Sequence, residues 1–411
     1  MNWRPWLELW SEEWIASRDP DELDPEVVQQ RWLGYAPAGE ADVGAVEQRL
    51  GLRLPPSYRS FLLTTNGWRH AGEFVWKMRD TTNLGWLREL EPSWESWADL
   101  VTEAPVDAPG NPFDRGLLIS LHTDAGALFL DPADRDENGE WAAYSVFSWA
   151  EFPRRYPSFT ALMESLYQGL HQLRQPQGKT RDNWDLVVEQ ARADALSGKV
   201  DEATAALEKA QRFGRSRATV LQTQLQMFQS TSSPYEASRI LSRLLSLSPA
   251  PDGFFTGSLF TEEFVPCMFL QHAHKEPWYG SALDTAQILE TARTDPGGAI
   301  KRAIDGHRAR TERPGYQLCY GNPAFDAAVR KALAQHHSDP AALWHALEPA
   351  MAHWQPRTPD HIAPVALLAD PVLAYSLTPE RGRALLRQPR SGRFDKMSGS
   401  EPPTSSSILN G

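Results

Sequence analysis

The chain has 411 residues, of which 41% are hydrophobic and 10% aromatic, which is enough for packed cores and argues against general disorder. Its formal net charge of −12 is uneven, because residues 1–178 hold 28 acidic and 15 basic side chains whereas residues 179–411 are close to neutral. An acidic first half repels phosphate, so the sequence disfavours a nucleic-acid partner and favours a basic one.

The sequence contains neither a membrane span nor a secretion signal by the usual criteria. No run approaches the ~18 consecutive apolar residues that a spanning helix needs. The first fourteen residues lack a basic start, a continuous apolar core and a small-residue cleavage site. Cys267 and Cys319 are the only cysteines, too few for a disulfide framework. We therefore expect a cytoplasmic protein with no membrane partner.

The first predicted element is an amphipathic helix over residues 3–15. Its apolar face follows a three-four spacing and consists of Trp3, Trp6, Leu7, Trp10 and Trp14. We expect residues 1–24 to form a tryptophan-rich N-terminal segment packed onto the next domain. Membrane-surface insertion is disfavoured, because the polar face is acidic. Twelve of the sixteen tryptophans lie before residue 150, a bias that suits both cores and interfaces.

Two short helices separated by a proline hinge are predicted between residues 43 and 68. Apolar residues share one face of the first helix, and Gly51 ends it in the left-handed conformation that glycine accepts. Pro55 and Pro56 start the second helix, and Asn66-Gly67 forms a tight turn after it.

This order of residues resembles the signature of the SUKH superfamily. The matching positions are Glu47, Leu50-Gly51, Leu54-Pro55, Tyr58, Phe61-Leu62 and Asn66-Gly67. The resemblance continues through a hairpin at residues 116–132 and a helix start at 158–163, and it covers residues 25–175. It implies an α+β fold, a small mixed sheet flanked by helices, and it brings no catalytic residues to this chain.

Strands and turns fill the rest of the SUKH-like domain. Alternating side chains predict strands over residues 73–78, 116–121, 127–130 and 141–149. Residues 94–101 form either a short helix or a strand, and the acidic residues 131–139 a polar turn. Ser158 starts a final helix that runs to about residue 173.

Beyond a linker at residues 176–183, the sequence predicts a mostly α-helical second domain over residues 184–390. A 34-residue self-similarity in residues 184–250 resembles two tetratricopeptide-like hairpins. Further helices are expected over residues 281–293, 323–335 and 340–352 and after Thr378. Residues 253–280 are expected to form a loop or irregular insertion, and residues 391–411 a disordered tail.

Enzyme motifs are missing from the sequence, and we predict neither a catalytic residue, a cofactor nor a metal. Gly-x-Ser-x-Gly, Gly-x-Gly-x-x-Gly and the Walker pattern do not occur. Cys267, His272 and His274 have metal-ligand chemistry but lack a second ligand pair. The acidic turn could attract calcium but lacks the ligand order of an EF-hand, so solvated charge explains it better.

The sequence therefore predicts a non-enzymatic protein-binding module. The SUKH resemblance implies an immunity protein that neutralises a toxin by direct binding, with an intracellular regulatory scaffold as the alternative. A basic toxin domain would meet acidic side chains and aromatic anchors. The candidate binding residues are Asn66, Trp68, Asp124, Asp134, Asp136, Glu137, Trp141 and Trp149.

Overall fold

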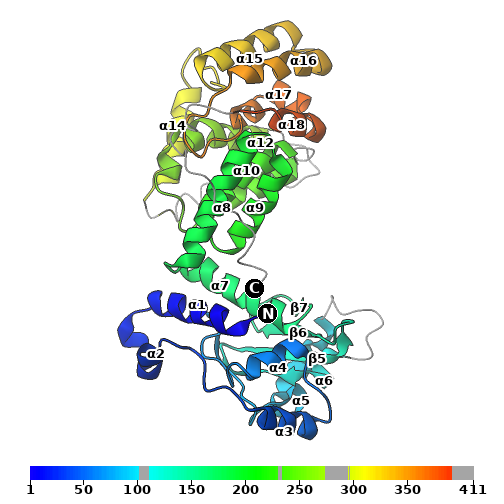
Figure 1. Cartoon of the computed structure of the whole chain (residues 1–411). Helices are drawn as coiled ribbons and strands as arrows, with labels where there is room; N and C mark the ends of the chain where they lie inside the picture. The colour runs from blue at the N-terminus through cyan, green and yellow to red at the C-terminus, as the bar shows by residue number, and fades with distance from the viewer. Residues whose placement is uncertain (101–110, 230–233, 274–294, 296, 391–411) are drawn as a thin grey trace. The chain divides into compact units, whose positions relative to one another are not determined.

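The computed structural model describes residues 1–100, 111–229, 234–273, 295 and 297–390 (Figure 1). These residues divide into two compact units. Unit 1 comprises Met1–Asp182 with Arg212–Gly214, and unit 2 comprises Asn183–Gln211 with the described residues from Arg215 onward. Within the described part of the chain, no helix is both long and apolar enough to cross a bilayer.

Unit 1 starts with α1 (Trp3–Ala16), which confirms the helix predicted over residues 3–15. Trp3, Leu7, Trp10 and Trp14 are buried along its inner face. The Trp10 ring lies 6.0 Å from that of Trp68, measured between centroids. Helix α1 is therefore part of the hydrophobic core of unit 1.

The proline-hinged helix pair has the predicted form. The pair consists of α3 (Glu40–Leu50) and α4 (Pro56–Leu62), and the short helix α2 (Pro25–Gln30) precedes it. Gly51 ends α3 at φ 71°, and its N–H donates to carbonyl groups in the last turn of that helix. Gly67 has φ 102°, as a turn glycine requires.

Two antiparallel sheets form the centre of unit 1. One pairs β1 with β4, and the other has the strand order β2-β3-β5-β6-β7. The strands are β1 (Val75–Met78), β2 (Gly85–Trp86), β3 (Leu117–Leu118), β4 (Ser120–Thr123), β5 (Gly126–Arg135), β6 (Trp141–Phe147) and β7 (Arg154–Tyr156). The α+β class is confirmed, although every described strand pair is antiparallel where the resemblance implied a mixed sheet.

Strand β5 continues into the stretch that was predicted to be a polar turn. Asp131 is buried in the strand, and Arg115 donates to both of its carboxylate oxygens at 2.6 and 2.7 Å. This ion pair compensates the buried charge, so the strand can continue past Asp131 to Arg135. The sequence pattern could not show which acids would be paired.

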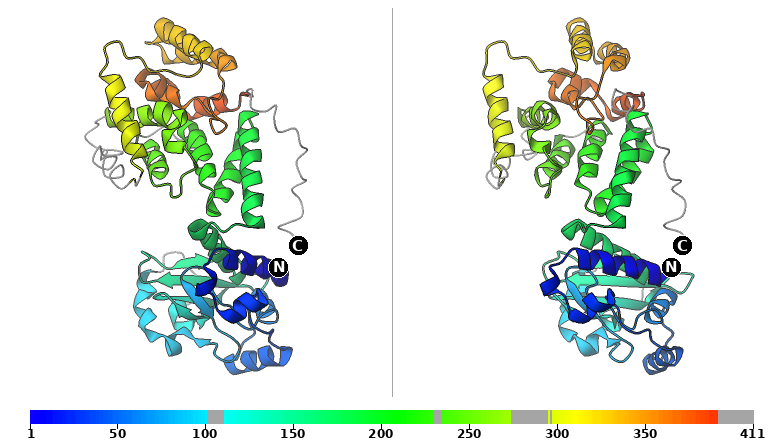
Figure 2. Two further views of the ribbon diagram at one scale, coloured as in Figure 1. Left: turned by 90° about the vertical axis from the view of Figure 1, so that its left-hand side faces the viewer. Right: turned by 60° about the vertical axis from the view of Figure 1, so that its left-hand side comes forward.

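Helices cover both faces of the larger sheet (Figures 1 and 2). Trp141 and Ala143 of β6 join the core formed with α1, α4 and α7 (Phe159–Arg174). The other face of β6 belongs to a second hydrophobic cluster, through Ala142, Tyr144 and Val146. That cluster involves α5 (Leu87–Leu90), η2 (Pro92–Leu100) and α6 (Pro112–Arg115). The segment predicted as either helix or strand is thus mostly a 3-10 helix.

A buried carboxylate, Glu13 of α1, joins α7 to the first turn of α8 (Lys179–Leu196). It accepts from the Thr180 N–H at 2.9 Å, from the Tyr167 hydroxyl, and lies 3.0 Å from His171 Nε2. Glu13 thereby caps a helix that starts 166 residues later in the chain, inside the stretch expected to be a linker.

In the described residues of unit 2, all regular secondary structure is helical. After α8 its helices are α9 (Val200–Arg212), α10 (Ser216–Gln229), α11 (Pro234–Leu245), η3 (Phe254–Thr256), the π-helical η4 (Leu259–Phe264), α12 (Val265–Ala273), α14 (Ala299–Thr311), α15 (Pro323–His336), α16 (Pro340–Ala350), η5 (Met351–His353), η6 (Val365–Ala369), α17 (Pro371–Ser376) and α18 (Pro379–Leu386). The helices predicted at 323–335, at 340–352 and after Thr378 are confirmed, and Thr378 caps α18.

One prediction for unit 2 is wrong. Residues 253–273 are largely helical, because their aromatic side chains pack inward instead of lining a loop, with Phe260 and Phe264 fully buried. The helix expected at 281–293 and the tail at 391–411 lie outside the described residues. The tetratricopeptide-like hairpins stay a prediction.

Candidate functional site

Three of the predicted binding residues are buried, which corrects the prediction for them. Trp68 lies in the core with its ring 5.1 Å from that of Trp32, and Trp141 is buried at the start of β6. Asp134 is buried and receives two hydrogen bonds from Arg155, at 2.7 and 2.8 Å. These side chains stabilise the domain and do not offer a surface to a partner.

The acidic residues at the end of β5 and in the turn before β6 mainly accept hydrogen bonds from within the domain. The Asp134 hydrogen bonds raise the pKa of the Arg155 guanidinium. Asp136 Oδ1 accepts from the N–H groups of Asn138 and Glu140. Asp136 and Glu137 are both exposed, so their role in binding stays a prediction.

The carboxylate of Glu140 and the amide of Asn66 stabilise the helix pair of the domain and the turn after it. Glu140 accepts from the Ser57 N–H at 2.8 Å and from its hydroxyl, which caps the start of α4. Asn66 is half-buried, and its amide bonds to the Thr81 N–H and hydroxyl at 2.8 and 3.1 Å. Asn66 therefore fixes the turn to the segment after β1.

The structure brings Trp149 into a cluster of surface rings that the sequence did not single out. We call Phe74, Trp76, Phe147 and Trp149 the aromatic patch. Trp149 lies 5.0 Å from Phe74 and 4.9 Å from Phe147, between ring centroids. The exposed fractions are 51% for Trp149, 50% for Trp76 and 37% for Phe74. Exposed rings grouped in this way are typical of protein-binding surfaces.

Asp124 lies at the edge of the aromatic patch. Its N–H donates to the Phe74 carbonyl at 2.9 Å, and the next carbonyl, that of Ala125, accepts from the Ser148 N–H at 2.9 Å. These bonds tie the β4–β5 turn to both segments that carry the rings. Of the predicted residues, Asp124 and Trp149 are therefore brought together.

The alternation within the predicted strand over residues 73–78 indicates that Phe74 and Trp76 lie at the surface. Phe74 and Trp76 alternate with Val75, and Val75 is buried. In a strand, alternate side chains point to opposite faces, so two large rings on the face opposite a core residue are expected at the surface. The prediction recognised this strand but did not use its outward face.

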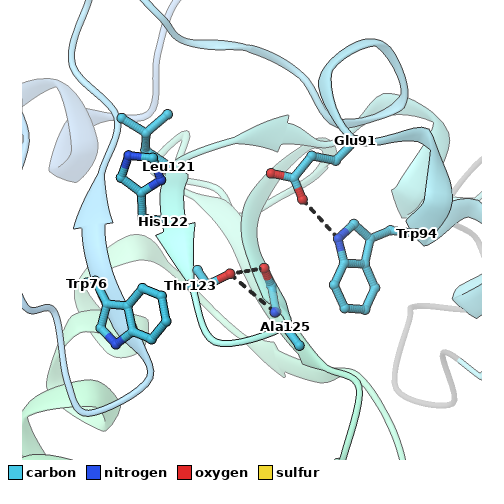
Figure 3. A pocket seen from close by; sticks show the side chains of 8 residues that line it. Trp76, Glu91, Trp94, Leu121, His122, Thr123 and Ala125 are labelled. Atoms are coloured by element: carbon cyan, nitrogen blue, oxygen red, sulfur yellow. Dashed lines mark hydrogen bonds between the residues drawn. The ribbon is translucent and has the colours of Figure 1, made fainter.

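Two surface hollows flank Trp76. The first, which we call the Trp76–Trp94 hollow, has a volume of about 320 Å³ (Figure 3). It is lined by Trp76, Glu91, Trp94, Leu121, His122, Thr123, Ala125 and Gly126. The second, of about 190 Å³, is lined by Trp14, Arg18, Glu22, Leu23, His70, Glu73 and Trp76.

In the second hollow, the charges of Arg18 and Glu73 are already paired with each other. Arg174 and Arg18 both bind the Glu73 carboxylate, and their hydrogen bonds and charges, led by Arg174, lower its pKa. His70 stacks on Trp14 at 4.8 Å, and burial with the nearby Arg18 charge lowers the pKa of its imidazole. Because these groups already interact with one another, we regard the first hollow as the better candidate for binding a partner.

Cys267 and His361, which have metal-ligand or acid-base chemistry, make contacts within unit 2. Cys267 is buried, and its thiol donates to the Val365 carbonyl at 3.3 Å. His361 uses both ring nitrogens, accepting from the Arg357 N–H and bonding to the buried Glu263 at 3.0 Å. His274 lies outside the described residues, and within those described no group of His, Cys, Asp and Glu could hold a metal ion.

Residues 37–165 match the model of the SMI1 / KNR4 family (SUKH-1). This segment of the chain is a SUKH domain. The match confirms the resemblance predicted from the proline-hinged helices, and it covers all four residues of the aromatic patch. At the level of the family, it supports a protein-binding role of the immunity or regulatory kind. Comparisons with curated proteins and with solved structures found no match.

Proposed function

We propose that the chain is an immunity protein that binds a basic toxin domain through the aromatic patch and neutralises it by covering its active cleft. The observation that carries this proposal is the exposure of three rings in a SUKH domain: Phe74 and Trp149, which contact each other, and Trp76, two residues after Phe74. Such a protein would act in the cytoplasm, where it would meet the toxin.

The aromatic patch supplies the affinity in this proposal. Tryptophan is enriched among the residues that carry most of the binding energy in protein interfaces, and truncating such an anchor costs about 2 kcal/mol or more. Phe74 and Phe147 both contact the Trp149 ring, so this ring is held in place before binding. A preorganised ring loses little conformational entropy in the complex.

The acidic surface supplies the choice of partner. Residues 1–178 carry a net charge of −13, and Asp124 lies beside the rings. Toxin domains that act on nucleic acid or nucleotides need basic clefts, which this surface complements. Blocking such a cleft requires contact alone, in agreement with the missing enzyme motifs.

The test combines growth protection with binding. The purified chain is titrated by calorimetry with each toxin domain encoded beside its gene, and the same pairs are co-expressed in a sensitive host. We expect one toxin to bind and its lethality to disappear. The double substitution F74A/W149A should weaken binding at least about tenfold and abolish protection.

Tyr375→Ala is the matched control, because Tyr375 is an aromatic residue of unit 2 that is 80% exposed. It should leave both measurements unchanged. Failure to bind any neighbouring toxin would contradict the immunity proposal and favour the regulatory scaffold. Full binding by F74A/W149A would show that another surface makes the contact.

A further inference from the structure

The Trp76–Trp94 hollow has two aromatic walls beside the aromatic patch. Trp76 projects from β1 on one side, and Glu91 and Trp94 stand on the other, with Thr123 and Ala125 between them (Figure 3). Trp94 is half-buried against the core cluster under the larger sheet, with its ring 5.7 Å from Trp97. One wall is therefore fixed by packing, whereas Trp76 stands half exposed.

A carboxylate is held in place between these walls. Glu91 Oε2 accepts from the indole N–H of Trp94 at 3.0 Å, so the carboxylate is fixed next to the ring. Within the described residues, no hydrogen bond to the other oxygen, Oε1, is seen. The hollow thus presents one oriented acceptor with a negative charge.

The surroundings leave this charge available to a ligand. None of the lining residues described is a lysine or arginine. Arg79 interacts electrostatically with Glu91, but it is buried and donates to the carbonyls of Ser120 and Asn83 at 2.8 and 2.9 Å. Because indole faces and a carboxylate both attract cations, the chemistry of the hollow matches a positively charged side chain.

We propose that the Trp76–Trp94 hollow binds a single arginine side chain of the protein partner. A guanidinium is planar, so it can stack on an indole face while two of its N–H groups donate to Glu91. Lysine has the charge without the plane, and so it should bind more weakly. This inference rests on the proposed function and extends it, because it names the side chain of the partner that the hollow binds.

The test uses the full chain labelled with 5-fluorotryptophan and small probes in place of the partner. The signals of Trp76 and Trp94 are assigned with the substitutions W76F and W94F. N-acetyl-arginine amide should shift both signals at millimolar concentration. N-acetyl-lysine amide should act more weakly, and N-acetyl-citrulline amide, the uncharged analogue of arginine, should have no effect.

Glu91→Gln keeps an oxygen that can accept from Trp94 and removes the charge, so it should weaken the arginine response about tenfold. Trp76→Leu, at an exposed position, tests the opposite wall without disturbing the core and should weaken the response too. Glu12→Gln is the control, because Glu12 is an exposed acid of α1 that does not line the hollow. It should leave the response unchanged.

Equal shifts with the arginine and citrulline probes, or a full response by E91Q, would overturn the inference. Its failure is distinguishable from that of the proposed function. If a toxin binds E91Q as tightly as the unaltered chain, the arginine assignment fails while the immunity proposal stands. If arginine amide occupies the hollow but no neighbouring toxin binds, the assignment stands and the toxin proposal fails.

Discussion

Glu13 is the residue whose loss should affect the stability of unit 1 most directly. Glu13 is 1% exposed, and its carboxylate accepts from Thr180, Tyr167 and His171. Glu13→Ala leaves these buried donors without an acceptor, so we expect a loss of about 3 kcal/mol in the free energy of unfolding. Urea denaturation measures it. Glu12→Ala, at an exposed position next to it, should cost less than about 0.5 kcal/mol.

The contribution of Glu13 should also depend on pH. Burial by itself raises the pKa of this carboxyl, but the hydrogen bonds from His171, Tyr167 and Thr180 outweigh it and the pKa is lowered. A lowered carboxyl pKa stabilises the fold above the unfolded value, near 4.5, and this stability is lost as the pH falls through the folded value. The stability difference between the unaltered chain and E13A should therefore shrink on acidification below about pH 4.5. A constant difference would contradict this assignment.

The burial of individual tryptophans could not be predicted from the sequence alone. Trp141 and Trp149 have the same parity along the strand predicted over residues 141–149, so alternation places them on one face. The strand ends at Phe147, and Trp149 lies beyond it at the surface while Trp141 is buried. Trp68, which follows a turn, is covered by α1. Periodicity gives the face of a strand, but the neighbours that cover the face come from distant segments.

At the scale of elements, α1 extends the core beyond the residues that match the SUKH model, which begin at residue 37. Trp10 is fully buried and contacts the rings of Trp68 and Tyr167. Trp10→Ala should destabilise unit 1 by about 3–5 kcal/mol, because it removes a large ring from a packed core. Chemical denaturation followed by circular dichroism would show it.

The control for this substitution is Trp76→Ala, since the Trp76 side chain is half exposed. It should change the free energy of unfolding by less than about 0.5 kcal/mol. A loss for Trp10→Ala as small as that for Trp76→Ala would contradict the role of α1 in the core.

Elements with strong local patterns were predicted well, and those that depend on distant partners were not. The ends of α3 and α18 follow from Gly51 and Thr378, whose roles are local. The continuation of β5 depends on Arg115, sixteen residues away, which pairs with Asp131. The helices in residues 253–273 bury Phe260 and Phe264, which lie one helical turn apart, but the glycines around them and the weak periodicity of the whole stretch favoured a loop.

At the scale of the whole molecule, the uneven charge is the property that the sequence reveals most directly. The acidic side chains concentrate in residues 1–178, but the structure shows that several of them are already paired with arginines inside unit 1. These ion pairs change the electrostatic potential far from the protein very little, because they leave its net charge unchanged. The charge should therefore affect the rate of encounter with a basic partner more than the lifetime of the complex.

Association with the neighbouring toxin domain should consequently slow down as salt is added. We expect the association rate constant to fall about tenfold between 20 and 200 mM salt, with little change in the dissociation rate constant, because the screening length shortens over this range. Stopped-flow measurements with the full chain give both constants. D124N/E151Q removes two exposed charges near the aromatic patch and should flatten the salt dependence, whereas Glu312→Gln in unit 2 should leave it unchanged. An association rate that is independent of salt would mean that the rings alone, and not the charge of the first half, select the partner.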